Sequence, residues 1–237
     1  MKAPLLLVSG WAHTAEDLDP LTERLPHDRP ARVLGINDLA GGPSYAAGLI
    51  REMGREPCVL VGWSMGGMIA LEAAAAEPKR VAALVMISSA PRLAAAPDFT
   101  EGVPPRTLQA MEQAFRRAPE RTLVDFFRNA SYPNFPGEDA AGEFANRALA
   151  AGADRLAAQL KYLAHAELRP LWTALSIPRL LIHGCRDRII PIGAAEWMFS
   201  RRRGTILDTF TDAGHRLPLD HPDWTAEPLL RFLETLS

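Results

Sequence analysis

Six short runs of apolar residues are spaced along the chain. They cover residues 5–8, 32–36, 58–61, 81–88, 179–183 and 205–210. The runs are nearly continuous rather than alternating, as in a parallel sheet that is covered by helices on both faces. Helices are expected between and after them, at 15–25, 44–53, 68–77, 193–200 and 222–236. This order predicts an α/β fold with a mostly parallel sheet and helices on both of its faces.

The alternation of strands and helices is interrupted between residues 91 and 170. Four segments there have helical character, at 108–117, 121–129, 142–151 and 154–167, and a loop with two prolines is expected at 130–139. No strand is predicted in this part of the chain. We therefore expect residues 1–90 and 171–237 to form the α/β core, and residues 91–170 to form an inserted helical cap.

A G-x-S-x-G sequence follows the third apolar run, and a strong helix former comes after it. Gly62 and Gly66 lie two residues on either side of Ser64, where a side chain would collide with a tight turn from strand to helix. Such a turn places the serine hydroxyl at a helix N-terminus, where backbone N–H groups and the helix dipole favour a developing negative charge. The context predicts that Ser64 is a nucleophile. The alternative is an ordinary serine in a glycine-rich turn.

A serine nucleophile needs a base, usually an imidazole that is oriented by a carboxylate. In an open α/β sheet these groups lie beyond the C-terminal ends of strands. His215 follows the last predicted strand and Asp187 follows the one before it, so both fit. The chain order Ser64, Asp187, His215 is the one expected for this type of hydrolase. The backbone N–H groups of Met65 and Trp11 are the candidate oxyanion donors.

Other residues fit these roles less well. His183 lies inside a predicted strand and is expected to be packed in the core, whereas His13 follows the first strand and is a candidate lining residue. Asp208 lies inside a strand, and Asp212 is too close in the chain to the histidine base. Two arginines flank Asp187, so a surface ion pair is the alternative interpretation for that carboxylate.

Composition excludes several classes of protein. The 237 residues carry a net charge of −2, so the chain has no basic excess for binding nucleic acid. No apolar run is long enough to span a membrane, and residues 3–8 suit a buried strand better than a signal peptide, so a cytoplasmic location is expected. Cys58 and Cys185 are expected to be small buried residues. We expect no disulfide framework, no metal site and no cofactor.

The sequence resembles the α/β-hydrolase superfamily over nearly its whole length. The similarity lies in the elbow at 62–67 and in the stretches PKRVAALVMIS, HGCRDRIIP and AGHRLPLDHP. It is more narrowly similar to the BioH-type carboxylesterases of biotin synthesis, in which the elbow reads G-W-S-[LM]-G-G and a tryptophan follows the glycine of the oxyanion loop. Gly10-Trp11 matches the second feature. The resemblance implies the triad and oxyanion donors named above, and hydrolysis of the methyl ester of pimeloyl-acyl carrier protein.

Two departures weaken the inference about one particular substrate. Ser9 stands where many relatives have histidine before the glycine, and residues 38–44 match the usual D-x-P-G-x-G-x-S loop only in part. Fold and triad are also shared by many activities. A thioesterase, a lactonase, a C–C hydrolase and a cofactor-free haloperoxidase therefore stay open, as does a ligand-binding protein without turnover.

The expected cap holds candidate substrate and partner residues. Six aromatic residues are candidates for lining an acyl pocket: Phe115, Phe126, Phe127, Tyr132, Phe135 and Tyr162. Together with Trp11, we take Phe126 and Phe127 as the candidate substrate-binding residues. Four arginines are candidates for docking an acidic acyl carrier protein: Arg116, Arg117, Arg121 and Arg128. Acidic residues are interleaved with them, so a solvated surface of mixed charge is an equally good interpretation.

Overall fold

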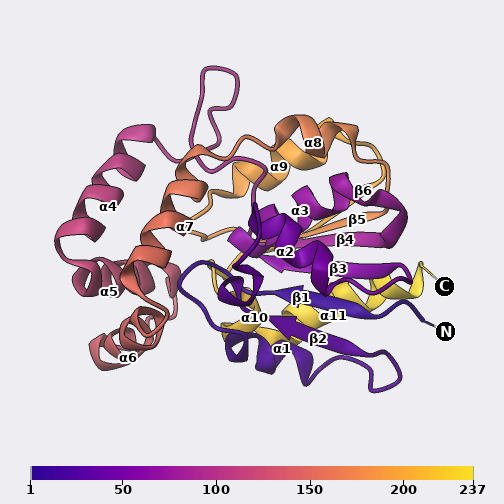
Figure 1. Cartoon of the computed structure of the whole chain (residues 1–237), viewed down its shortest axis with the longest axis horizontal. Helices are drawn as coiled ribbons and strands as arrows, with labels where there is room; N and C mark the ends of the chain where they lie inside the picture. Colours follow the sequence, from indigo (N-terminus) through magenta and orange to yellow (C-terminus); the bar gives the residue numbers. More distant parts are fainter. Residues whose placement is uncertain (1, 237) are drawn as a thin grey trace.

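The computed structural model, which describes residues 2–236, contains one sheet of six parallel strands (Figure 1). Their order across the sheet is β2-β1-β3-β4-β5-β6. The strands are β1 (Leu5–Val8), β2 (Ala31–Leu34), β3 (Cys58–Trp63), β4 (Val81–Ile87), β5 (Arg179–Gly184) and β6 (Thr205–Phe210). The predicted α/β fold with a parallel sheet is confirmed.

Helices cover both faces of the sheet, which explains why the inner strands β1, β3 and β4 are apolar along nearly their whole length, whereas the edge strands β2 and β6 include polar and exposed residues. Along β3, Leu60 packs into the core on one face, whereas Val59 and Val61 pack into the core on the other face. The first face carries α2 (Tyr45–Glu52), α3 (Met65–Ala76), α8 (Arg169–Ala174) and α9 (Ile192–Arg201). The second face carries α1 (Asp19–Thr22), α10 (Leu217–Asp220) and α11 (Pro222–Glu234).

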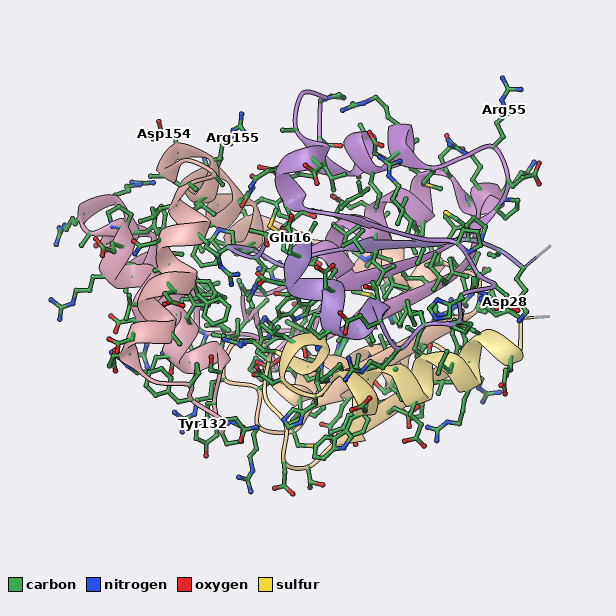
Figure 2. The ribbon with its side chains drawn as sticks, turned by 90° about the horizontal axis from the view of Figure 1, so that it is seen from below. Glu16, Asp28, Arg55, Tyr132, Asp154 and Arg155 are labelled. Atoms are coloured by element: carbon green, nitrogen blue, oxygen red, sulfur yellow. The ribbon has the colours of Figure 1, made fainter. Side chains whose placement is uncertain are left out.

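Four further helices lie together at one end of the molecule, away from both chain termini (Figure 1). They are α4 (Pro105–Arg117), α5 (Pro119–Ala130), α6 (Glu138–Leu149) and α7 (Ala153–His165), and we call them the cap helices. Figure 2 shows Asp154 and Arg155 projecting from the outer end of the cap, and Arg55 projecting from the opposite side of the molecule. The exact division between core and cap at residues 91 and 170 stays a prediction.

Several local expectations were wrong, each for a physical reason. The single helix expected at 15–25 is a 3-10 helix at Glu16–Leu18 followed by α1, because Pro20 has no N–H to continue the helical hydrogen bonds. The second strand ends at Leu34, since the N–H of Gly35 turns to the carboxylate of Asp38. Helix α6 begins inside the expected loop at 130–139, and the short helices α8 and α10 were not predicted.

Two further sequence expectations concern cysteines and membranes. Cys58 is buried, but Cys185 is exposed, because it follows the last residue of β5 in a turn. Both are free thiols. Within residues 2–236, no helix combines the length and apolar character needed to cross a bilayer.

Candidate active site

Ser64 occupies a strained turn between β3 and α3. Its φ is 55° and its ψ is −121°, a backbone conformation that residues other than glycine rarely adopt. A Cβ on Gly62 would lie 2.4 Å from the backbone of Gly66, and a Cβ on Gly66 would lie 2.4 Å from the carbonyl oxygen of Val8. Only glycine fits either position. The hydroxyl of Ser89 donates to the carbonyl oxygen of Ser64 at 2.7 Å and helps to hold the turn.

The three side chains predicted to form a triad lie in hydrogen-bond contact. His215 Nε2 is 3.0 Å from Ser64 Oγ, and His215 Nδ1 is 2.8 Å from Asp187 Oδ2. The other carboxylate oxygen of Asp187 accepts from the backbone N–H groups of Ile189 and Ile190, both at 2.8 Å. An acceptor carboxylate at Nδ1 places the imidazole proton there, so Nε2 is free to accept the serine proton.

The loops that carry Asp187 and His215 are packed directly against each other. A Cβ on Gly184 would lie 2.4 Å from the carbonyl oxygens of Ala213 and the residue after it. The N–H of Arg186 donates to the carbonyl oxygen of Ala213 at 2.9 Å. Since β5 and β6 are neighbours in register, their C-terminal ends deliver the two loops to the same edge of the sheet.

The arginines beside Asp187 do not pair with it. Arg186 lies 2.9 Å from Asp212 at the surface, and Asp208 lies 3.4 Å from Arg231. The side chain of Asp187 has no exposed surface. The two rival carboxylates are thus engaged elsewhere, and the surface ion pair considered for Asp187 is not formed.

His183 lies next to Asp187, which its location inside a strand did not predict. It is fully buried in β5, as expected for a core residue, and its Nε2 lies 2.9 Å from the carbonyl oxygen of Ile190. The same nitrogen is 3.4 Å from Asp187 Oδ2. Burial lowers the pKa of His183, so the ring is neutral and supports the turn that holds the carboxylate.

The two candidate oxyanion donors flank the nucleophile. Met65 begins α3, where an N–H has no partner one turn earlier in the helix. The loop after β1 passes beside Ser64, since a Cβ on Gly10 would lie 3.2 Å from Ser64 Cβ. Within residues 2–236 the backbone N–H groups of Trp11 and Met65 have no hydrogen-bond acceptor. Both are therefore free to bind a developing oxyanion.

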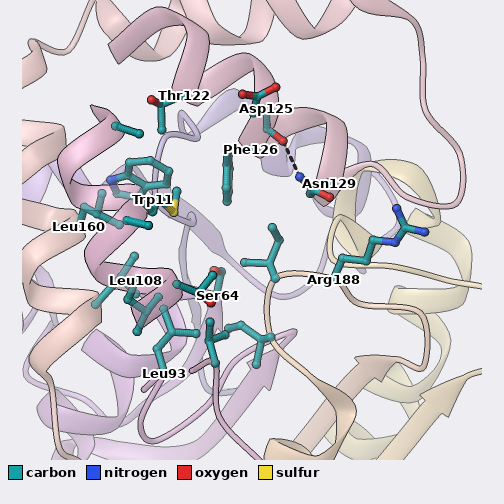
Figure 3. A pocket seen from close by; sticks show the side chains of 18 residues that line it. Trp11, Ser64, Leu93, Leu108, Thr122, Asp125, Phe126, Asn129, Leu160 and Arg188 are labelled. Carbon is teal, nitrogen blue, oxygen red and sulfur yellow. Dashed lines mark hydrogen bonds between the residues drawn. The ribbon is translucent and has the colours of Figure 1, made fainter. Parts of the chain in front are cut away.

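A cavity of about 400 Å³ opens in front of Ser64 and lies between the sheet and the cap helices (Figure 3). Phe126 points into it from α5, Trp11 lines one side, and Arg188 lies at the side opposite to Trp11. Most of the remaining lining is aliphatic or thioether: Leu93, Val103, Leu108, Ala110, Met111, Ala114, Leu160, Leu163, Ile189 and Ile190. Such a lining suits an apolar acyl chain.

Of the candidate substrate residues, Trp11 and Phe126 line this cavity and Phe127 does not. Phe127 stacks on Phe144 with ring centres 5.2 Å apart, and its ring contacts His13 edge-on at 5.3 Å. The other aromatic candidates of the cap do not line the cavity either. The aliphatic lining was missed, because leucine and methionine in amphipathic helices give no signal that separates a pocket from a core.

The four candidate docking arginines differ in their surroundings. Arg128 donates to Glu138 at 2.7 Å and to an aspartate on its own helix at 2.6 Å. Arg116 lies 3.9 Å from a glutamate one turn earlier. Arg117 and Arg121 are exposed and have no ion-pair partner in the part of the chain that the structure describes. Of the four candidates, these two are therefore the ones whose charge is not paired among the described residues.

No metal site is evident. Among residues 2–236, no three side chains of histidine, cysteine, aspartate or glutamate are placed to hold an ion together.

The chain belongs to the alpha/beta hydrolase family, whose model matches residues 5–227. It is an ester-hydrolysing enzyme, as its esterase relatives and the fold indicate. It is 30% identical to the pimeloyl-[acyl-carrier protein] methyl ester esterase of Xanthomonas campestris pv. campestris, over 98% of this chain and 95% of that protein. It is 29% identical to the protein of the same name from Aromatoleum aromaticum, over 92% of this chain and 93% of that one.

Solved structures show the same fold at lower identity. An esterase from Exiguobacterium antarcticum superimposes with a TM-score of 0.83 and 19% identity, and covers 99% of this chain and 93% of its own. A bromoperoxidase from Bacillus anthracis gives a TM-score of 0.87 at 18% identity, with coverages of 99% and 92%. At these identities the likeness concerns the fold alone.

Proposed function

We propose that this protein is a serine carboxylesterase whose catalytic triad is Ser64, Asp187 and His215. The observation that carries the proposal is the unbroken hydrogen-bond chain from Ser64 Oγ through His215 to the buried carboxylate of Asp187. His215 takes the hydroxyl proton while the serine oxygen attacks the ester carbonyl. Asp187 keeps the imidazole in the required tautomer and stabilises the imidazolium.

The tetrahedral intermediate is stabilised by the N–H groups of Trp11 and Met65. Each oxyanion donor contributes roughly 3 kcal/mol to the stability of the transition state. His215 then returns its proton to the leaving alcohol, and an acyl-enzyme remains on Ser64. Water, deprotonated by the same imidazole, hydrolyses the acyl-enzyme and regenerates the free serine. No step requires a cofactor.

We propose further that the substrate is the methyl ester of pimeloyl-acyl carrier protein, used in biotin synthesis. The relatives that carry this name cover nearly the whole chain, and the apolar cavity at Ser64 suits the acyl chain. The carrier would approach over the cap helices, with its acidic surface towards Arg117 and Arg121. The cytoplasm is the compartment in which such a carrier is found.

Release of methanol from pimeloyl-acyl carrier protein methyl ester tests the proposal, beside p-nitrophenyl esters of short and medium chains. The wild type should cleave both classes of ester. Ser64→Ala should lower kcat by about a million-fold, as in other serine triads. Turnover of the Ser64→Ala variant near the wild-type rate would contradict the triad. Cleavage of p-nitrophenyl esters alone would retain the triad and reject the carrier-bound substrate.

The docking surface is tested by reversing its charge. Arg117→Glu combined with Arg121→Glu should raise KM for the carrier-bound ester about tenfold, because surface charges steer encounter with an acidic partner. KM for p-nitrophenyl butyrate should not change. Arg55→Glu is the matched control, since Arg55 projects from the far side of the molecule (Figure 2). An unchanged KM for the carrier ester in the double variant would reject this surface.

A further inference from the structure

A second buried histidine and aspartate pair lies in the loop that carries the proposed oxyanion donor Trp11. His13 Nδ1 is 2.9 Å from Asp17 Oδ2, and the two side chains are 1% and 6% exposed. The same carboxylate oxygen accepts the backbone N–H of Thr14 at 3.0 Å. Its other oxygen accepts from the guanidinium of Arg147 at 3.1 Å. Asp17 therefore joins three donors at the base of the loop.

The pKa of His13 is too low for the ring to act as an effective acid or base near neutral pH. Burial lowers the pKa of His13 to about 4, so the ring is neutral near pH 7 and donates from Nδ1. Burial opposes the charge on Asp17, but its bond to His13 and the nearby positive charge of Arg147 still hold its pKa below the ordinary value. His13 does not line the cavity at Ser64. Its hydrogen bond thus acts on the loop and not on substrate.

The loop needs such support because its backbone is strained next to the nucleophile. Ala12 has a φ of 62°, in the left-handed region that favours glycine. The N–H of His13 donates to the carbonyl oxygen of Gly10 at 3.2 Å, and the hydroxyl of Ser9 donates to the carbonyl oxygen of His13 at 3.3 Å. The imidazole of His13 also packs on Trp63, with ring centres 4.1 Å apart. The backbone and the ring of His13 therefore both stabilise the conformation of this loop.

Two cap helices hold this loop from outside. Arg147 reaches Asp17 from α6, and the indole N–H of Trp11 donates to the carbonyl oxygen of Leu156 in α7 at 3.0 Å. The loop residues that form these bonds, Trp11 and Asp17, lie on either side of His13 in the sequence. The loop that carries the Trp11 N–H is thus fixed at one end by α7 and at the other by α6.

We propose that Asp17 and His13 are positioning residues for the backbone N–H of Trp11. Because Arg147 connects Asp17 to cap helix α6, the orientation of this N–H depends on the position of α6 relative to the loop. The proposal rests on the function proposed above, because Trp11 is an oxyanion donor only in that mechanism. If so, loss of the ion pair between Arg147 and Asp17 weakens the stabilisation of the transition state. The affinity for the substrate in its ground state stays unchanged.

The test compares Arg147→Met with Arg155→Met. Both arginines are exposed on cap helices, but Arg155 projects into solvent and has no hydrogen bond or ion pair in the described residues (Figure 2). The readouts are kcat and KM for p-nitrophenyl butyrate, and the inhibition constant of an alkyl trifluoromethyl ketone. The ketone forms an oxyanion on Ser64 and so reports on the oxyanion site.

Arg147→Met should lower kcat about fivefold, well short of the loss caused by deleting an oxyanion donor, which is about a hundredfold or more. The inhibition constant should rise by the same factor and KM should stay constant. Arg147→Lys should recover part of the activity, because a positive charge still reaches Asp17. Arg155→Met should match the wild type. An unchanged kcat in Arg147→Met, or a lower kcat without weaker ketone binding, would overturn the proposal.

Asp17→Asn supplies a second measurement. It should lower kcat about tenfold, and the double variant with Arg147→Met should be no worse than Asp17→Asn alone, since residues in one network are not additive. Fully additive losses would contradict a shared route. Failure of this proposal is separable from failure of the proposed function, because wild-type turnover and its loss in Ser64→Ala test the triad independently. If Asp17→Asn does not fold, the Arg147 variants decide the matter.

Discussion

The indole N–H of Trp63 donates a hydrogen bond of 3.0 Å to the backbone carbonyl oxygen of His215. Trp63 is fully buried and immediately precedes Ser64 in the elbow. The residue next to the proposed nucleophile therefore fixes the loop of the proposed base. This bond connects β3 to the loop that follows β6, although β3 and β6 are not neighbours in the sheet. This bond therefore helps to set the distance between the side chains of the proposed nucleophile and the proposed base.

Replacing Trp63 with phenylalanine should remove this bond and lower kcat. We expect a loss of about tenfold, because a loop displacement of a fraction of an ångström is costly in a preorganised site. The free energy of unfolding should fall by about 2 kcal/mol, from one lost hydrogen bond and a small cavity. Measurements of kcat and of urea denaturation test both effects.

Trp172→Phe is the matched control for this prediction. Trp172 is equally buried, and its indole N–H donates to the carbonyl oxygen of Met198 at 2.9 Å, away from the cavity. It should lose a similar amount of stability and keep the wild-type kcat. If both variants lose activity equally, the bond between Trp63 and His215 has no special role.

Stability towards acid should depend on His13. Its folded pKa of about 4 lies below the unfolded value of 6.5, so the unfolded chain binds the extra proton in the window between them. The stabilising contribution is complete above pH 6.5 and is lost as the pH falls towards 4, at no more than about 1.4 kcal/mol per pH unit. Asp17 favours the charged ring, whereas Arg216 and His215 oppose it, and burial dominates.

His13→Gln should therefore flatten the dependence of unfolding free energy on pH across this window, as measured by urea denaturation. Some dependence should remain, because burial also lowers the pKa of His183. His27→Gln, which replaces an exposed histidine, is the matched control for this substitution. An equal slope in His13→Gln and the wild type would show that folding does not lower the pKa of His13.

Acyl chain length should respond to the volume of the cavity in front of Ser64. Met111 lines it from α4, and Met111→Trp should fill part of the space. Each excluded methylene loses about 0.8 kcal/mol, so excluding two should lower kcat/KM for medium-chain esters about tenfold relative to acetate. Gln113→Trp lies on the same helix, is exposed and does not line the cavity. A similar chain-length profile in both variants would place the acyl chain elsewhere.

The elbow and the parallel sheet were predictable because their signals are local. Gly62 and Gly66 stand where a Cβ would collide with nearby backbone, and the buried parallel strand before Ser64 is apolar throughout. The resemblance to the hydrolase superfamily and to BioH-type esterases is confirmed by the family match and the relatives. The positions of Asp187 and His215 at strand ends also followed from topology.

The contents of the cap were harder to predict, because they depend on contacts between distant segments. Phe126 and Phe127 are adjacent on one helix, yet the first lines the cavity and the second packs on Phe144. The bond from Arg147 to Asp17 spans 130 residues, and no local pattern indicates it. His13 was a candidate lining residue, but the structure places it in the support of the loop.

The role of Ser64 as the nucleophile is tested most directly by locating the residue that reacts with a fluorophosphonate ester probe, using intact mass and peptide mapping. Catalysis through Ser64 predicts one phosphonate per wild-type chain, attached to this residue. It predicts no label in Ser64→Ala, and labelling slowed by about a hundredfold or more in His215→Gln, where the general base is absent. No label on the wild type, or equal labelling of wild type and Ser64→Ala, would contradict Ser64 as the nucleophile.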